Sequence, residues 1–155
     1  MNMDNGMLAR GFSKEARFVD EELFNGSRQL HDSSALGIEN TVHDELATVW
    51  EECREPNWDG FQAIPVTQDT LRNTYRFLEV LPFGFPQPSV GAEPDGDLTL
   101  EWHRSARRTL SVSINADGDL NYAALLGPNR SYGTETFFSD VPGAILNLIR
   151  RVHAE

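Results

Sequence analysis

The chain has 155 residues, which is enough for one domain with a hydrophobic core and too few for two domains of ordinary size. Hydrophobic residues make up 39% of the chain and no apolar run is long enough to span a bilayer, so collagen-like, wholly disordered and membrane-spanning classes are excluded. The formal net charge is −11, which disfavours direct binding to nucleic acids or anionic membranes because both need a basic surface.

The single cysteine, Cys53, excludes an intramolecular disulfide framework and a zinc site built from several cysteines. The first residues contain no cationic segment followed by an apolar run, so no signal peptide is predicted. We therefore expect a soluble cytoplasmic protein.

Residues 1–40 are rich in Asn, Asp, Ser and Gly but also contain three phenylalanines. This mixture predicts a partly ordered N-terminal arm that precedes a single domain, residues 41–155. An alternative is that the arm packs on a partner or on a second copy of the chain, which would give a homodimer.

Two amphipathic helices are predicted in the first half of the domain. The first begins with a capping-box pattern at Thr41 and ends before Pro56, and its apolar stripe includes Cys53, which predicts a buried thiol. The second begins after Thr67 as N-cap and ends at Pro82. Residues 82–94 contain four prolines and two glycines and predict a long connector.

Alternating apolar and polar residues predict strands over 98–102, 110–114 and 120–124, with a fourth near 134–138. Hairpin turns are predicted at Asp95-Gly96 and Asp117-Gly118. A last helix is predicted from a cap at Asp140, with Pro142 in its first turn and basic residues at its end. The fold class is therefore α+β, with a small antiparallel sheet of three or four strands covered on one face by about three helices.

No phosphate-binding loop, serine-hydrolase elbow or His-Glu-x-x-His pattern occurs, so no cofactor, metal or catalytic residue is predicted. The two Asp-Gly-Asp strings, 95–97 and 117–119, lack the further ligands of a calcium loop and are interpreted as turns. A small hydrolase or nuclease with a scattered site, such as Glu101 and Glu135 with a histidine, remains an alternative.

Three groups of residues are candidates for contact with a protein partner. Trp58 and Asp59 lie in the string Asn-Trp-Asp-Gly-Phe, where the tryptophan either fills the edge of the core or serves as a contact anchor. The other two groups are the basic hairpin tip, Arg104, Arg107 and Arg108, and the acidic helix residues Glu51 and Glu52.

The Asn57–Gly60 string, the helix after Thr67, Asp95-Gly96 leading into Leu100-Glu101-Trp102, and the string 131–135 together resemble a family of small bacterial proteins with no assigned activity. The resemblance covers about residues 41–152. It implies a bacterial or phage origin and assigns no catalytic residue.

Charge and the missing catalytic motifs favour a non-enzymatic protein-binding module, such as an antitoxin, an immunity protein or an anti-defence inhibitor. Its partner is expected to be a protein with a basic surface. One form of this hypothesis is that the acidic surface mimics the charge of a nucleic acid. A structural subunit of a homo-oligomer is the remaining alternative.

Overall fold

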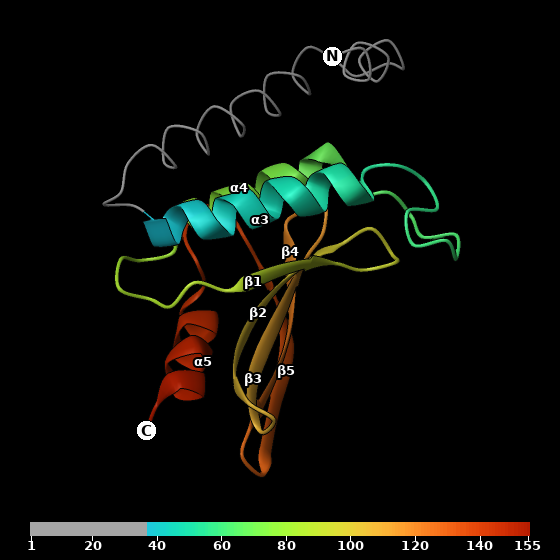
Figure 1. Ribbon diagram of the computed structural model, residues 1–155. Coiled ribbons are helices and arrows are strands. Elements are labelled where there is room, and N and C mark those ends of the chain that lie inside the picture. The colour runs from blue at the N-terminus through green and yellow to red at the C-terminus, as the bar shows by residue number, and fades with distance from the viewer. Residues whose placement is uncertain (1–36) are drawn as a thin grey trace.

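The computed structural model describes residues 37–155, which form three helices and five strands in the order α-α-β-β-β-β-β-α (Figure 1). The helices are α3 (Gly37–Cys53), α4 (Gln68–Val80) and α5 (Gly143–His153). The strands are β1 (Ser89–Ala92), β2 (Leu98–Ser105), β3 (Arg108–Ile114), β4 (Asp119–Leu126) and β5 (Asn129–Thr136). The predicted α+β class is confirmed, with five strands in place of three or four.

All five strands join one antiparallel sheet in which each strand lies beside its neighbour in sequence. Because successive strands reverse direction, the β1–β2 and β3–β4 turns lie at one end of the sheet. The β2–β3 and β4–β5 turns lie at the other end. This arrangement decides which charged turns come together.

The inner face of the sheet carries the core, and the helices cover it (Figure 1). The buried residues of β2, β3 and β4 recur at every second position, or at a multiple of two, which places them all on this face. Helix α5 packs on β2, β3 and β4, while α3 lies against β1. The fully buried large side chains are Trp50, Trp102, Phe77, Leu46, Leu71, Leu98, Leu100, Leu110, Ile114, Leu120, Ile145 and Ile149.

The outer face of the sheet is polar, and none of the described helices covers it (Figure 1). The strand register aligns its side chains in rows, for example Glu101, Ser111, Ala123 and Tyr132 across β2 to β5. Small hydroxyl side chains on an open antiparallel face are typical of a face in contact with solvent.

Helix α3 begins at Gly37, so the predicted start at Thr41 is wrong and residues 37–40 are helical. In the sequence Ile38 lies four positions before Val42, and this continues the spacing of Val42 and Leu46 past the capping pattern. The predicted buried thiol is confirmed, because Cys53 lies in the core. The first 36 residues of the predicted arm lie outside the described part of the chain.

Of the side-chain caps predicted for α4 and α5, only the cap of α4 is present. Thr67 caps α4 as predicted, since its Oγ1 accepts a hydrogen bond from the Thr70 amide at 3.3 Å. Asp140 does not cap α5: Pro142 takes the N-cap position and no side chain caps the helix. The predicted basic C-terminal turn of α5 is confirmed at Arg150, Arg151 and His153.

Strand β1 was missed, because it is only four residues long and Val90 is its one buried side chain. The last predicted strand was shifted, since β5 covers residues 129–136 and its side chains are all at least partly exposed, which leaves no strong apolar pattern to detect. Among residues 37–155, no helix combines the length and apolar character that a membrane crossing requires.

Candidate functional site

The string that contains Trp58 folds into a loop held by its own polar groups; we call residues 56–66 the Trp58 loop. Asn57 Oδ1 accepts from the Gln62 amide at 2.6 Å, and Asp59 Oδ1 accepts from the Phe61 and Ala63 amides at 2.7 and 3.0 Å. The Asn57 amide also donates to the Ala63 carbonyl at 2.9 Å. Asn and Asp are suited to this role because their short side chains bond to nearby backbone amides. The loop is therefore internally braced.

Trp58 is half-buried and packs against the core, and its Nε1 donates to the Ile64 carbonyl at 2.9 Å. The same loop exposes two other large apolar side chains: Phe61 is 86% exposed and Ile64 is 56% exposed. Trp58 thus supports the loop from inside, while Phe61 and Ile64 are presented at its surface. The sequence reasoning singled out Trp58 and passed over these two residues.

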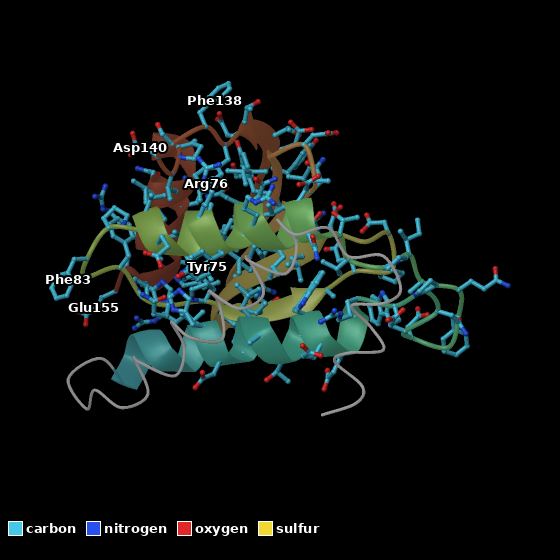
Figure 2. All side chains as sticks on the ribbon, turned by 90° about the horizontal axis from the view of Figure 1, so that it is seen from above. Tyr75, Arg76, Phe83, Phe138, Asp140 and Glu155 are labelled. Carbon is cyan, nitrogen blue, oxygen red and sulfur yellow. The ribbon has the colours of Figure 1, made fainter. Side chains whose placement is uncertain are left out.

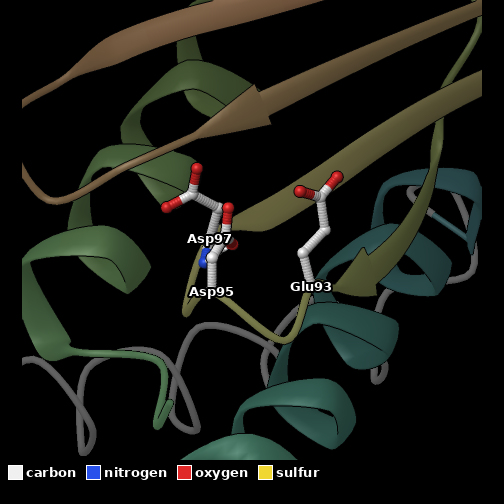
Figure 3. A group of neighbouring side chains, drawn as sticks. All are labelled: Glu93, Asp95 and Asp97. Carbon is white, nitrogen blue, oxygen red and sulfur yellow. Dashed lines mark hydrogen bonds between the residues drawn. The ribbon is translucent and has the colours of Figure 1, made fainter. Parts of the chain in front are cut away.

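Three carboxylates gather in the β1–β2 turn (Figure 3). We call Glu93, Asp95 and Asp97 the acidic turn; one ligand oxygen from each lies within 4.8 Å of the others. Glu93 Oε1 accepts from Thr99 Oγ1 at 2.6 Å and from Ser113 Oγ at 2.8 Å, which fixes this carboxylate against the outer face of the sheet. Asp95 Oδ1 accepts from the backbone amide of Asp97 at 3.0 Å.

The crowding of this turn changes the acidity of one member. Partial burial, the negative charge of Asp95 and that of Glu93 together raise the pKa of Asp97 from 3.8 to about 6. Burial disfavours the charged form, and each neighbouring carboxylate repels a second negative charge. Asp97 therefore takes up a proton at a pH at which an ordinary aspartate remains charged.

The Trp58 loop and the acidic turn touch each other. The Ile64 amide donates to the Pro94 carbonyl at 2.8 Å. At Gly96, where φ is +96°, an added Cβ would lie 3.2 Å from both the Ile64 side chain and the Pro65 carbonyl. Glycine is needed here because of both the positive φ and the close approach. The Trp58 loop and the acidic turn, which are distant in the sequence, thus form one surface. It carries exposed apolar side chains and, in the same surface, a cluster of carboxylates.

Glu51 and Glu52 lie on the last turn of α3, which leads directly into the Trp58 loop. Both are exposed, and Glu51 is also paired with Arg54 at 3.2 Å. The amide of Val66, at the far end of the loop, donates to the Cys53 carbonyl at 2.9 Å, so the base of the loop is closed beside these glutamates. Glu51 and Glu52 therefore lie beside the base of the Trp58 loop, whereas Trp58 and Asp59 make their hydrogen bonds within the loop.

The basic hairpin tip lies at the other end of β2, away from the acidic turn. Arg104 Nη1 donates to the His153 carbonyl at 3.1 Å, and Arg108 Nη1 donates to the Arg151 and Ala154 carbonyls at 3.0 and 2.8 Å. Two of the three arginines predicted to contact a partner thus hold the C-terminal end of α5. Arg107 lies exposed in the β2–β3 turn.

The scattered acid pair considered for a hydrolase does not form one site. Glu101 shares an outer-face row with Ser111, whereas Glu135 pairs with Leu120 on the inner-face register of β4. The two carboxylates point to opposite faces of the sheet, which removes the geometry that general acid–base chemistry with this pair would need.

Sequence reasoning interpreted Asp95-Gly96-Asp97 as a turn only. The turn is confirmed, and Gly96 has the expected positive φ. The carboxylates were not expected to gather, and the missing signal was Glu93, which stands two residues before Asp95. Glu93 and Asp97 lie opposite each other across the hairpin, where the Glu93 amide donates to the Asp97 carbonyl at 2.9 Å, and opposite residues project to the same side of a sheet. A hairpin turn predicted around Asp95-Gly96 would therefore have indicated the cluster once Glu93 was included.

No protein-family model matches the chain, and no curated protein or solved structure matches it. The resemblance to small bacterial proteins stays a prediction.

Proposed function

We propose that this protein is a small, non-enzymatic binding module that attaches to a basic protein surface through the Trp58 loop and the acidic turn. The observation that carries the proposal is their contact: a braced loop exposes Phe61 and Ile64, and Ile64 lies against the turn that gathers three carboxylates. The role we infer is inhibition or neutralisation of the partner, of the antitoxin, immunity or anti-defence type, in the cytoplasm of a bacterium or its phage.

The apolar part of this surface supplies affinity. Large side chains presented on a rigid support lose little conformational entropy on binding, and aromatic anchors dominate the energetics of many interfaces. Phe61 is mostly exposed, although the amides around it are already hydrogen-bonded within the loop. Its burial by a partner would therefore cost little reorganisation.

The acidic part supplies specificity. Carboxylates at close spacing attract arginine and lysine side chains and steer a basic partner toward the surface. Proteins that handle nucleic acids carry such basic surfaces, so the acidic turn together with Glu51, Glu52 and Asp59 suits mimicry of nucleic-acid charge.

The test is capture of partners by the tagged full chain from cells of its own host, with quantitative mass spectrometry. The contact variant is Phe61→Ala with Ile64→Ala, and the charge variant is Asp95→Asn with Asp97→Asn. The matched control is Phe83→Ala, because Phe83 is 100% exposed and points away from the molecule beyond the C-terminal end of α4 (Figure 2).

We expect one stoichiometric partner that both loop and charge variants lose, that Phe83→Ala retains, and that is held more weakly as salt rises. A set of captured proteins that is the same for all four chains would contradict the proposal. Trp58→Ala is a poor probe, because Trp58 supports the loop and its removal changes the fold of the site itself.

A further inference from the structure

We propose that a second copy of this chain pairs with the free edge of the sheet at β5, through a two-fold axis perpendicular to the sheet. Strand β5 pairs with β4 on one side, and no strand of residues 37–155 lies on its other side. Its eight residues are all exposed or half-exposed. The unpaired backbone groups of such an edge are suited to receive another strand.

The opposite edge of the sheet is protected. Strand β1 has only four residues and α3 lies against it. The Val90 amide donates to Glu45 Oε1 of α3 at 2.6 Å, so a side chain already takes a donor of this edge. By contrast, β5 has no proline or lysine, its register with β4 is continuous, without a bulge, and its only charged residues are Arg130 and Glu135. The edge at β1 is therefore blocked by its short length and by α3, whereas the backbone of β5 is blocked by neither among the described residues.

The hydrogen-bonding groups of β5 can be assigned from its hairpin. Leu126 and Asn129 are partners on either side of the two-residue turn, and such a closing pair exchanges hydrogen bonds. Bonded and non-bonded pairs then alternate along an antiparallel ladder. The residues that direct their amide and carbonyl outward are therefore Arg130, Tyr132, Thr134 and Thr136.

Charge favours a second copy as the occupant. Arg130 lies near one end of β5, whereas Thr136 at the other end pairs with Asp119 of β4. A perpendicular two-fold axis keeps the two outer faces together and reverses the strand, so Arg130 of each copy can lie opposite Thr136 of the other, beside its Asp119. The same attraction then occurs twice, with Gly133 of one copy opposite Gly133 of the other.

Pairing along one eight-residue strand buries a small area, so we expect a weak dimer that forms as concentration rises. The acidic turn and the Trp58 loop adjoin β1, at the far edge of the sheet from β5. Both copies of that surface would stay accessible, which makes the dimer bivalent for a basic partner.

The first test is sedimentation equilibrium of the full chain over a wide concentration range, with Arg130→Glu as the variant and Arg107→Glu as the control. Both substitutions reverse one charge at the same end of the sheet, but only Arg130 lies on the β5 edge. We expect a reversible dimer whose dissociation constant rises about tenfold in Arg130→Glu, because two attractions become repulsions, and is unchanged in Arg107→Glu.

The second test removes a backbone amide that the dimer would need. Thr134→Pro removes an outward amide, while Thr134→Ala removes the same hydroxyl and its 2.8 Å bond to Asn121 but keeps the amide. The proline variant should be monomeric with an unchanged circular dichroism spectrum, and the alanine variant should dimerise. A chain that is monomeric at every concentration, or a dimer that Arg130→Glu and folded Thr134→Pro leave intact, would overturn the proposal.

Discussion

Trp50 and Trp102 are both almost fully buried, but only one of them has a partner for its indole N–H among the described residues. Trp102 Nε1 donates to the Pro86 carbonyl at 2.8 Å and so ties the connector before β1 to the core. Trp50 Nε1 is buried without a hydrogen bond in the described part of the chain. A buried polar group without a partner costs free energy, whereas a satisfied one holds its acceptor in place.

We therefore predict that Trp102→Phe lowers the free energy of unfolding by about 1–2 kcal/mol more than Trp50→Phe does. Both substitutions remove a similar ring volume, and only Trp102→Phe leaves a carbonyl, that of Pro86, without its donor. Trp50→Phe also weakens the contact with the Arg54 guanidinium, which lies 5.1 Å from the Trp50 ring centroid, so the predicted difference is what remains after that smaller loss. Urea unfolding followed by circular dichroism measures both values. Equal losses in the two variants would show that the Trp102 hydrogen bond adds no net stability.

The sequence predicted the local setting of a residue correctly where its type and position favour one setting only. Cys53 on an apolar stripe, Thr67 before a helix and Gly96 after an aspartate each have one favourable setting, and each occupies it. Trp58 had two uses, as core support or as contact anchor, and composition does not choose between them. The choice depends on Ile64 and the core beneath the loop, which only the tertiary fold brings together.

At the scale of elements, the basic end of the sheet acts on helix α5. The last carbonyls of a helix lack partners within it and carry partial negative charge. Arg108 Nη1 reaches two carbonyls in this region, those of Arg151 and Ala154. The hairpin tip interpreted from sequence as a contact surface is thus partly a helix cap supplied by a distant strand.

We predict that Arg108→Ala lowers the free energy of unfolding by about 1 kcal/mol, because two hydrogen bonds from a charged donor are lost at a partly exposed site. Arg107→Ala is the control, since Arg107 lies in the exposed turn next to it, and it should change stability little. Thermal unfolding of the two variants and the parent chain provides the measurement. A loss as large in Arg107→Ala would mean that the charge of the tip, and not the cap, stabilises α5.

The elements that sequence predicted poorly are those with little burial. Strands β2, β3 and β4 alternate because one face is buried, and this pattern was readable. Strand β1 has one buried side chain and β5 has none, so neither leaves a strong period of two. Edge strands are held mainly by backbone hydrogen bonds, which any sequence can make.

At the scale of the whole molecule, charge is separated along the sheet. The acidic turn lies at one end, and the other carries Arg104, Arg107, Arg108 and Arg130 in its turns and adjoining strand ends. The net charge of −11 is a sum over the whole chain, so it predicts an acidic protein but not where on the surface the carboxylates lie. The β1–β2 turn brings together three carboxylates that alternate along five residues, and their mutual repulsion opposes folding.

That repulsion has a pH signature at Asp97. Its pKa rises from 3.8 to about 6 on folding, so the folded protein holds this proton more tightly than the unfolded chain, and its contribution to stability falls as pH rises between about 4 and 6. Asp97→Asn should match the parent chain below pH 4 and exceed it above pH 6 by roughly 1 kcal/mol, reduced by solvent screening at this partly exposed group. Urea unfolding across this range measures the difference, and Glu101→Gln controls for the loss of one negative charge elsewhere on the sheet. A difference that stays constant with pH would show that folding leaves Asp97 titrating as it does in the unfolded chain.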